Sequence, residues 1–252
     1  MHPEKNIIFF VGDTHGRFRN LRKAVRKHKP AAVILLGDVQ PRTPLQEEIA
    51  VILAQTEVWF IHGNHDTDTE ADYDNLQGSA LAHRNLHGRV VEIAGLRIAG
   101  LGGIFREKVW MPPDEPTFDS PEDFMRRMGA GNAWRGGLPL AHRSTIFPSE
   151  MRALGQLRAD VLVTHEAPFL HPYGRDGLVH LARSMGVSRL YHGHHHDNLD
   201  YEPVRQAWGL PFAVHGVGLR GITDQDGQVV TPGELDEQRA HRASQMIWPG
   251  HP

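Results

Sequence analysis

Seven side chains in the sequence have the chemistry of metal ligands, and each follows a short apolar run. They are Asp13, His15, Asp38, Asn64, His165, His194 and His196. Asp13 and His15 are two residues apart, so in an extended backbone their side chains would share a face and could hold one ion. The same argument applies to His194 and His196. Seven oxygen and nitrogen ligands exceed the needs of one tetrahedral site and fit two ions that share a carboxylate such as Asp38.

A pair of metal ions points to chemistry at phosphorus. Two cations about 3.5–4 Å apart can clamp the attacking and leaving oxygens of an in-line displacement. The sequence has 18 histidines and no cysteine. The absence of cysteine excludes a disulfide framework, a thiolate nucleophile and sulfur-based zinc sites, so imidazole and carboxylate must bind any metal. We therefore expect metal-dependent hydrolysis of a phosphoester.

The elements that would position these ligands follow an α/β pattern. Short β-branched and aromatic runs alternate with amphipathic helical patterns, as in βαβ units around a buried sheet. Strands are predicted at 7–11, 31–36, 57–61, 89–93, 96–100, 160–164, 187–191 and 212–217, and helices at 17–29, 44–54, 148–158 and 178–185. Five of these strands run into clusters that contain Asp, Asn or His. In an open α/β sheet the loops after the strands converge on one crevice, where ligands bind.

Two parts of the chain lack such a pattern. Residues 105–147 are rich in proline, glycine and arginine, and a stretch this long without periodicity indicates an insertion over a site. We interpret it as a lid or cap on a single domain that includes residues 1–252. The tail after Gly218 shows little beyond a turn at Asp226-Gly227.

The ordered motifs resemble the signature of calcineurin-like metallophosphoesterases. They are Asp13-x-His15, Gly37-Asp38, Gly63-Asn64-His65-Asp66, Thr164-His165-x-x-Pro168 and Gly193-His194-x-His196. The motifs span residues 12–196 and leave the tail outside. The resemblance implies a four-layer α/β/β/α sandwich, with two sheets packed together and helices outside, and a binuclear metal centre.

The resemblance also implies a role for each residue. Asp13, His15 and His196 would hold the first metal, Asn64, His165 and His194 the second, and Asp38 would bridge them. His65 would contact the phosphate or protonate the leaving oxygen, with Asp66 orienting it. The nucleophile would be a hydroxide between the metals, because a bound cation lowers the pKa of water from about 15.7 toward roughly 7. The cofactors would be two divalent ions, with manganese expected and iron, zinc or cobalt compatible with the same ligands.

The expected substrate is a small phosphomonoester or phosphodiester, nucleotides included. Arg42 occupies the place of the phosphate-holding arginine of the protein serine/threonine phosphatases, and His62 precedes the Gly-Asn-His motif, so both are candidates for substrate contact. The run Gly37-Asp38-Val39-Gln40-Pro41-Arg42-Thr43 lacks the second aspartate and the glycine of that branch, which argues against protein phosphatase activity. Five arginines of the insertion could clamp phosphate or lie on the surface: Arg106, Arg126, Arg127, Arg135 and Arg143.

Two other functions remain open at this point. A nuclease could use the same centre, but a formal net charge of −3 and only five lysines give no basic track, so nucleic acid is not the expected partner. A catalytically silent binding module should have lost ligands, and this chain keeps the full set. No apolar run is long enough for a signal peptide or a membrane span, so we expect a cytoplasmic protein without membrane contact and leave its oligomeric state open.

Overall fold

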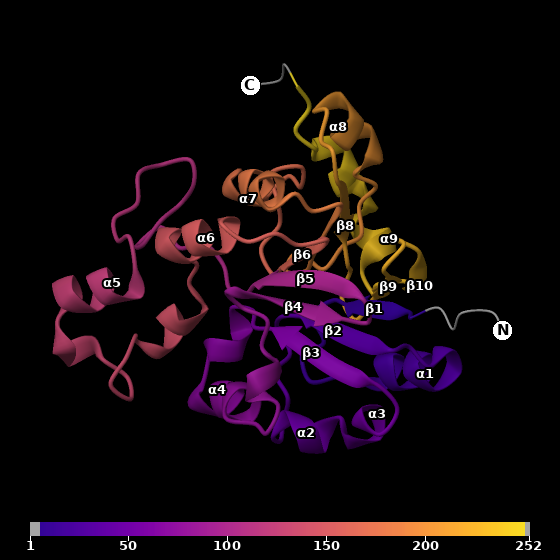
Figure 1. Ribbon diagram of the computed structural model, residues 1–252, viewed down its shortest axis with the longest axis horizontal. Helices are drawn as coiled ribbons and strands as arrows, with labels where there is room; N and C mark the ends of the chain where they lie inside the picture. Colours follow the sequence, from indigo (N-terminus) through magenta and orange to yellow (C-terminus); the bar gives the residue numbers. More distant parts are fainter. Residues whose placement is uncertain (1–5, 250–252) are drawn as a thin grey trace.

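Two five-stranded sheets form the framework of the computed structural model, which describes residues 6–249 apart from the side chain of Ala130 (Figure 1). The first sheet has the order β10 (Val229–Thr231), β9 (Ile222–Asp224), β1 (Ile8–Val11), β2 (Ala32–Leu36) and β3 (Glu57–Ile61). The second has the order β4 (Arg89–Ile93), β5 (Leu96–Leu101), β6 (Val161–Thr164), β7 (Arg189–His192) and β8 (Ala213–Gly216). Strands β1 to β3 are parallel, as are β5 to β8, whereas β9, β10 and β4 add antiparallel edges.

The two sheets pack face to face through alternate residues of each strand. All four residues of β1 are buried, because its two faces meet different layers. Phe10 points to the second sheet and stacks on Tyr191 of β7, with ring centroids 3.8 Å apart. Phe9 and Val11 point the other way, toward the helices. An apolar strand without polar alternation is thus explained by burial on both sides.

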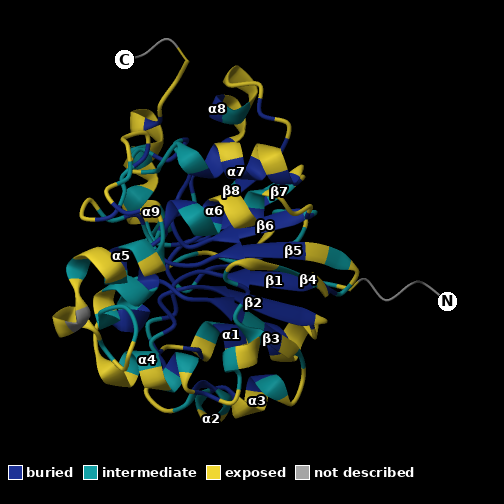
Figure 2. Cartoon of the chain, turned by 60° about the vertical axis from the view of Figure 1, so that its left-hand side comes forward, coloured by how far each residue is buried: buried dark blue, intermediate teal, exposed yellow. Residues whose placement is uncertain are grey.

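Helices cover the outer face of each sheet. The first sheet is covered by α1 (Arg19–His28), α2 (Leu45–Glu48) and α3 (Ala50–Leu53), and the second by α6 (Pro148–Gly155), α7 (Gly177–Met185) and α8 (Glu202–Ala207). Figure 2 shows the buried strands between these helices, whose outer surfaces are exposed. The four-layer α/β/β/α sandwich is confirmed. Among residues 6–249, no helix has the length and apolar character needed to cross a membrane.

The structure corrects one predicted helix and adds elements to the tail. The predicted helix 44–54 is two short helices, because Ile49 takes φ −111° and ψ 19°, outside the helical range, and interrupts the run. The turn at Asp226-Gly227 joins β9 to β10. Sequence patterns gave no indication of β9, β10, α8, α9 (Asp236–Arg239) or the 3₁₀ helix η5 (Ala240–Gln245).

The segment 105–147 has a small core of its own and one regular helix. Its helix α5 (Pro121–Met128) begins at Ser120, whose side chain accepts a hydrogen bond from the backbone N–H of Asp123. The Ser-Pro pair at 120–121 is a helix-start signal that periodicity alone overlooks. The buried residues of this small core are Val109, Phe118, Phe124 and Phe147. The other elements of the chain are α4 (Glu70–Gln77) and the 3₁₀ helices η1 (His65–Thr67), η2 (Ala82–Arg84), η3 (Ala130–Asn132) and η4 (Leu140–Ser144).

Replacing Phe10 by alanine should cost about 3–5 kcal/mol of unfolding free energy, because the ring is fully buried between the sheets. Urea denaturation of the metal-free protein measures this loss. Val51→Ala is the matched control, since Val51 is 64% exposed and should change stability by less than about 0.5 kcal/mol. Equal losses in the two variants would contradict the assignment of Phe10 to the interface between the sheets.

Candidate metal centre and active site

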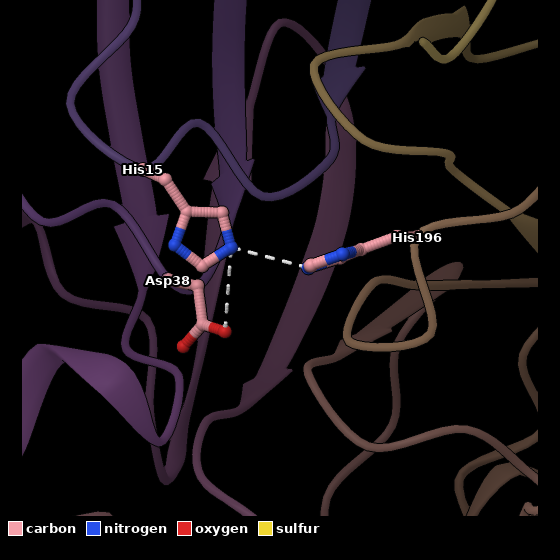
Figure 3. Close-up of side chains that lie close together, drawn as sticks. All are labelled: His15, Asp38 and His196. Carbon is pink, nitrogen blue, oxygen red and sulfur yellow. Dashed lines mark hydrogen bonds and ion pairs between the residues drawn. The ribbon is translucent and has the colours of Figure 1, made fainter. Parts of the chain in front are cut away.

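The loops after β1, β2 and β7 bring three of the expected ligands into one group. Nε2 of His15 lies 3.1 Å from Nε2 of His196 and 4.0 Å from Oδ2 of Asp38. Figure 3 shows one ring nitrogen of His15 facing both His196 and Asp38. Nε2 of His196 also lies 3.4 Å from Oδ2 of Asp13. Separations of this size suit donors around one cation, so this group fits the first metal implied by the sequence.

A second group adjoins the first and shares Asp38 with it. Oδ1 of Asp38 lies 3.4 Å from Nε2 of His165, which in turn lies 3.2 Å from Oδ1 of Asn64. The ring of His194 is 5.0 Å from that of His165, measured between centroids. Asp38, His165 and His194 form a second arrangement that could hold a metal. The structure thus places all seven sequence-predicted ligands together, with the two oxygens of Asp38 turned toward different groups.

Neighbouring groups orient the ligand rings. Nδ1 of His165 bonds to the backbone carbonyl of Leu36 at 2.7 Å, which leaves its Nε2 for the centre. Nδ1 of His15 lies 2.6 Å from Oε1 of Gln40, which orients the His15 ring in the same way. Hydrogen bonds of this kind fix the tautomer of a metal-binding imidazole and the direction of its lone pair.

The backbone that carries the ligands is not extended, which corrects the expected pairing across a pleat. β1 ends at Val11 and β7 ends at His192, before the paired ligands begin. His15, His194 and His196 have φ of 42°, 69° and 55°, so each ligand pair converges through a turn and not through alternation along a strand. Left-handed backbone at residues other than glycine costs of order 1–3 kcal/mol each and is concentrated at functional sites.

Two glycines make room for the ligands. A Cβ atom on Gly63 would overlap Asp38 Oδ1, and one on Gly37 would overlap Nδ1 of His165. Gly37 also has φ 96°, which other residues rarely adopt. Both positions therefore require glycine for the shared carboxylate and His165 to approach each other.

The electrostatics of the group fit bound cations. Asp13 and Asp38 are almost completely buried, and within residues 6–249 both oxygens of Asp13 and Oδ2 of Asp38 have no hydrogen-bond partner. Burial raises the pKa of Asp13 to about 8. Burial lowers the pKa of His194 to about 3 and that of His196 to about 4, so both imidazoles are neutral at pH 7 and keep a lone pair for a metal. A bound cation would offset the lost hydration of these carboxylates and favour their ionised form.

His65 lies at the edge of the group and takes its orientation from Asp68. Its ring centroid is 5.6 Å from that of His15, and its backbone N–H donates to Oδ1 of Asp38 at 2.8 Å. Nδ1 of His65 lies 2.6 Å from Oδ2 of Asp68. Burial would lower the pKa of His65, but the hydrogen bond to Asp68 raises it overall. The histidine and the aspartate are three residues apart across η1, a spacing that could have identified this pair from the sequence.

Asp66 does not orient His65, which corrects the expectation from the motif. Its side chain is fully buried and accepts hydrogen bonds from the backbone N–H groups of Gly63 and Gln40, each at 2.8 Å. It therefore ties the loop after β3 to the loop after β2. Through Gln40, the same contact supports the orientation of His15.

The two candidates for substrate contact differ in their surroundings. Arg42 is exposed, and its side chain passes beside Gly16, next to His15. His62 is 5% exposed, and its ring lies 4.8 Å from that of His87, between centroids, with Nδ1 3.4 Å from Nδ2 of Asn85. His62 therefore packs against His87 and Asn85, whereas Arg42 is open to solvent.

The insertion arginines contact the protein and do not gather into one clamp. Arg126 and Arg127 pair with Asp123 of their own helix. Arg135 pairs with Glu70 and Asp74 of α4. Arg143 donates to the hydroxyl of Tyr73, also in α4, at 3.1 Å. Arg106 approaches η1, because it donates to Ser144 Oγ, which lies 2.6 Å from Oγ1 of Thr67.

Three arginines of the tail approach the ligand loops, and sequence reasoning missed them. Nε of Arg220 donates to the carbonyl of Thr14 at 3.2 Å. Arg239 and Arg242 both donate to the carbonyl of His195. The His195 ring itself stacks on His171, with centroids 4.0 Å apart. No local pattern marks these arginines, because their contacts join segments far apart in the chain.

Comparisons with known proteins agree with this geometry. The family model described as calcineurin-like phosphoesterase matches residues 7–198. An uncharacterised protein of Haemophilus influenzae is 42% identical over 221 residues, which is 88% of this chain and 95% of that protein. The crystal structure of TT1561 from Thermus thermophilus covers 90% of this chain and 98% of its own, with a TM-score of 0.55 and 13% identity, and shows a similar fold. The family match includes all seven predicted ligands and excludes the tail.

The different contacts of Asp66 and Asp68 predict different effects on stability. Asp66→Asn should cost about 1–3 kcal/mol of unfolding free energy, because the amide offers one oxygen to two buried N–H donors. Asp68→Asn should cost less than about 1 kcal/mol, because that side chain is half exposed. Urea denaturation of the two metal-free variants makes the comparison. A larger loss for Asp68→Asn would contradict the role given to Asp66.

Proposed function

The chain belongs to the calcineurin-like phosphoesterase family, and from this premise we propose that it hydrolyses a small phosphomonoester or phosphodiester, nucleotides included, with two divalent metal ions. One observation carries the proposal: two ligand groups adjoin each other and share the buried carboxylate of Asp38. Manganese is the metal we favour, and iron, zinc and cobalt suit the same imidazole and carboxylate donors. The cytoplasmic location and the absence of a nucleic-acid partner stay predictions from the sequence.

The assignment of ligands follows the two groups. Asp13, His15 and His196 would hold the first ion, and Asn64, His165 and His194 the second, with Asp38 between them. Bound there, the cations would offset charge on the phosphate and lower the pKa of water to give a nucleophile near neutral pH. The protein contributes imidazoles and carboxylates that are already placed and partly or fully buried, so little reorganisation is needed when substrate binds.

His65 is the residue we assign to the phosphate or the leaving oxygen. When Nδ1–H donates to the Asp68 carboxylate, Nε2 is left free for the substrate. The raised pKa of His65 favours a ring that is protonated and can donate from Nε2. Asp66 acts as a positioning residue for the loops.

The surroundings of the centre complete the proposal. Arg42 stays a candidate for substrate contact, because it is exposed beside Gly16. The same role for His62 stays a prediction from the sequence, since the contacts of its buried ring are with His87 and Asn85. The insertion 105–147 is proposed as a cap on the single domain, supported by the contact of Ser144 with Thr67 in η1.

A panel of phosphomonoesters, cyclic nucleotides, dinucleoside polyphosphates and phosphopeptides, assayed with added Mn²⁺, tests the function. Turnover should be lost on chelation and restored by the metal. A metal-free preparation that stays inactive on the whole panel after Mn²⁺ is added would overturn the proposal and favour a binding module.

Asp38→Ala and His196→Ala should each lower kcat on a responsive substrate by at least about 10³-fold, because the ions carry much of the barrier reduction. His241→Ala, an exposed histidine outside the centre, is the matched control and should keep wild-type activity. Near-normal turnover in either Asp38→Ala or His196→Ala would contradict the proposed mechanism.

Asp68→Asn should affect substrates according to their leaving groups. For an alkyl phosphate, which needs a proton on the leaving oxygen, kcat/KM should fall about 10- to 100-fold. For p-nitrophenyl phosphate the fall should be below about threefold, because nitrophenolate departs without a proton. Asp114→Asn, an exposed aspartate of the insertion, controls for the change of charge. Equal losses on both substrates would show that Asp68 does not act through proton donation by His65.

A further inference from the structure

The C-terminal tail returns to the metal centre beside the loop after β7. Arg239, the last residue of α9, and Arg242 in η5 each donate from Nη1 to the carbonyl of His195. His195 lies between His194 and His196, one proposed ligand of each metal. Both guanidinium groups therefore lie next to the centre, although they belong to a segment outside the family match.

The two arginines differ in their charge partners. Nη1 of Arg242 lies 2.7 Å from Oδ2 of the buried Asp197, which neutralises it. Within residues 6–249, Arg239 forms no ion pair. Burial and the neighbouring charge of Arg242 lower the pKa of Arg239, against a smaller opposite effect of Asp197 and Asp13, neither of which is within ion-pair distance.

Arg220, which approaches the other ligand loop, provides a contrast. It donates to the Thr14 carbonyl and also forms an ion pair with Glu234, so its charge is already matched. Arg239 is thus the tail arginine that combines a place beside the centre with an unmatched charge. Nη1 is occupied by the His195 carbonyl, whereas a guanidinium has five N–H donors in all.

These observations point to an anion as the missing partner. A partly buried positive charge without a partner is unfavourable, and phosphate oxygens match the planar fork of arginine. We propose that Arg239 binds a non-bridging phosphate oxygen of the substrate on the His196 side of the centre. The proposal rests on the proposed function and names a residue of the tail as part of the substrate site.

The experiment compares phosphate binding by the full-length, Mn²⁺-loaded wild type and Arg239→Gln. Calorimetric titration with inorganic phosphate should show affinity about ten- to a hundredfold weaker in the variant, the usual loss for a charge-assisted hydrogen bond. KM for a responsive phosphomonoester should rise by a similar factor, with a smaller change in kcat. Arg239→Lys should recover part of the affinity because it keeps the charge.

Controls separate phosphate contact from support of the loop. Arg205→Gln is the matched control, since Arg205 also donates to a backbone carbonyl, that of Leu210, and pairs with Glu202 away from the centre. It should bind phosphate as the wild type does. Metal content measured by plasma mass spectrometry should be the same in all variants.

Two results would overturn the inference: unchanged phosphate affinity in Arg239→Gln, or loss of bound manganese from that variant, which would show that the arginine acts on the ligand loop. Failure of the proposed function would give a different result, the absence of hydrolysis by the wild type. If the wild type hydrolyses no phosphoester on the panel, the comparison of phosphate affinities still decides whether Arg239 binds the anion.

Discussion

The rest of the structure depends on the burial of two carboxylates, Asp13 and Asp38, among imidazoles. Neither aspartate has an arginine or lysine within ion-pair distance in the described part of the chain, and three of their four oxygens lack a hydrogen-bond donor. Burying such groups costs several kcal/mol unless a charge compensates. Loops from both sheets meet at one edge and place the predicted ligands together. A cation bound among them would compensate the charge of the two buried carboxylates.

That convergence is built from ordinary packing and a few strained residues. The sheets are joined by an apolar interface that includes Phe10 and Tyr191, which fixes where each strand ends. Beyond the strand ends, left-handed backbone at His194 and His196 turns both rings inward. Hydrogen bonds from Gly63 and Gln40 to Asp66 connect two of the loops. The packed strands and the hydrogen bonds between the loops keep His194 and His196 in their unfavourable left-handed backbone conformation.

Sequence reasoning identified strands β1 to β8, the order of the predicted ligand motifs and the layered fold, because burial on two faces leaves continuous apolar runs. It was less successful where geometry depends on turns. The pairing of His194 with His196 was expected from a pleat, whereas their φ values place both residues in a turn. It also gave His65 the wrong neighbour, since Asp66 is adjacent in the chain but its carboxylate points to backbone N–H groups, and Asp68 reaches the ring across η1.

The tail shows why the remaining information is absent from local patterns. The tail residue Arg239 contacts the His195 carbonyl, 44 residues earlier, and the 3₁₀ helix that follows it has no clear periodicity. Hydrophobic periodicity indicates which face of a segment is buried. It gives no information about an arginine side chain that donates to a backbone carbonyl far away in the sequence. The ion pairs distinguish the three tail arginines from one another. Arg220 and Arg242 have carboxylate partners, and Arg239 has none in the described chain. An arginine beside a proposed metal ligand and without a carboxylate partner among the described residues is placed to receive the substrate's charge.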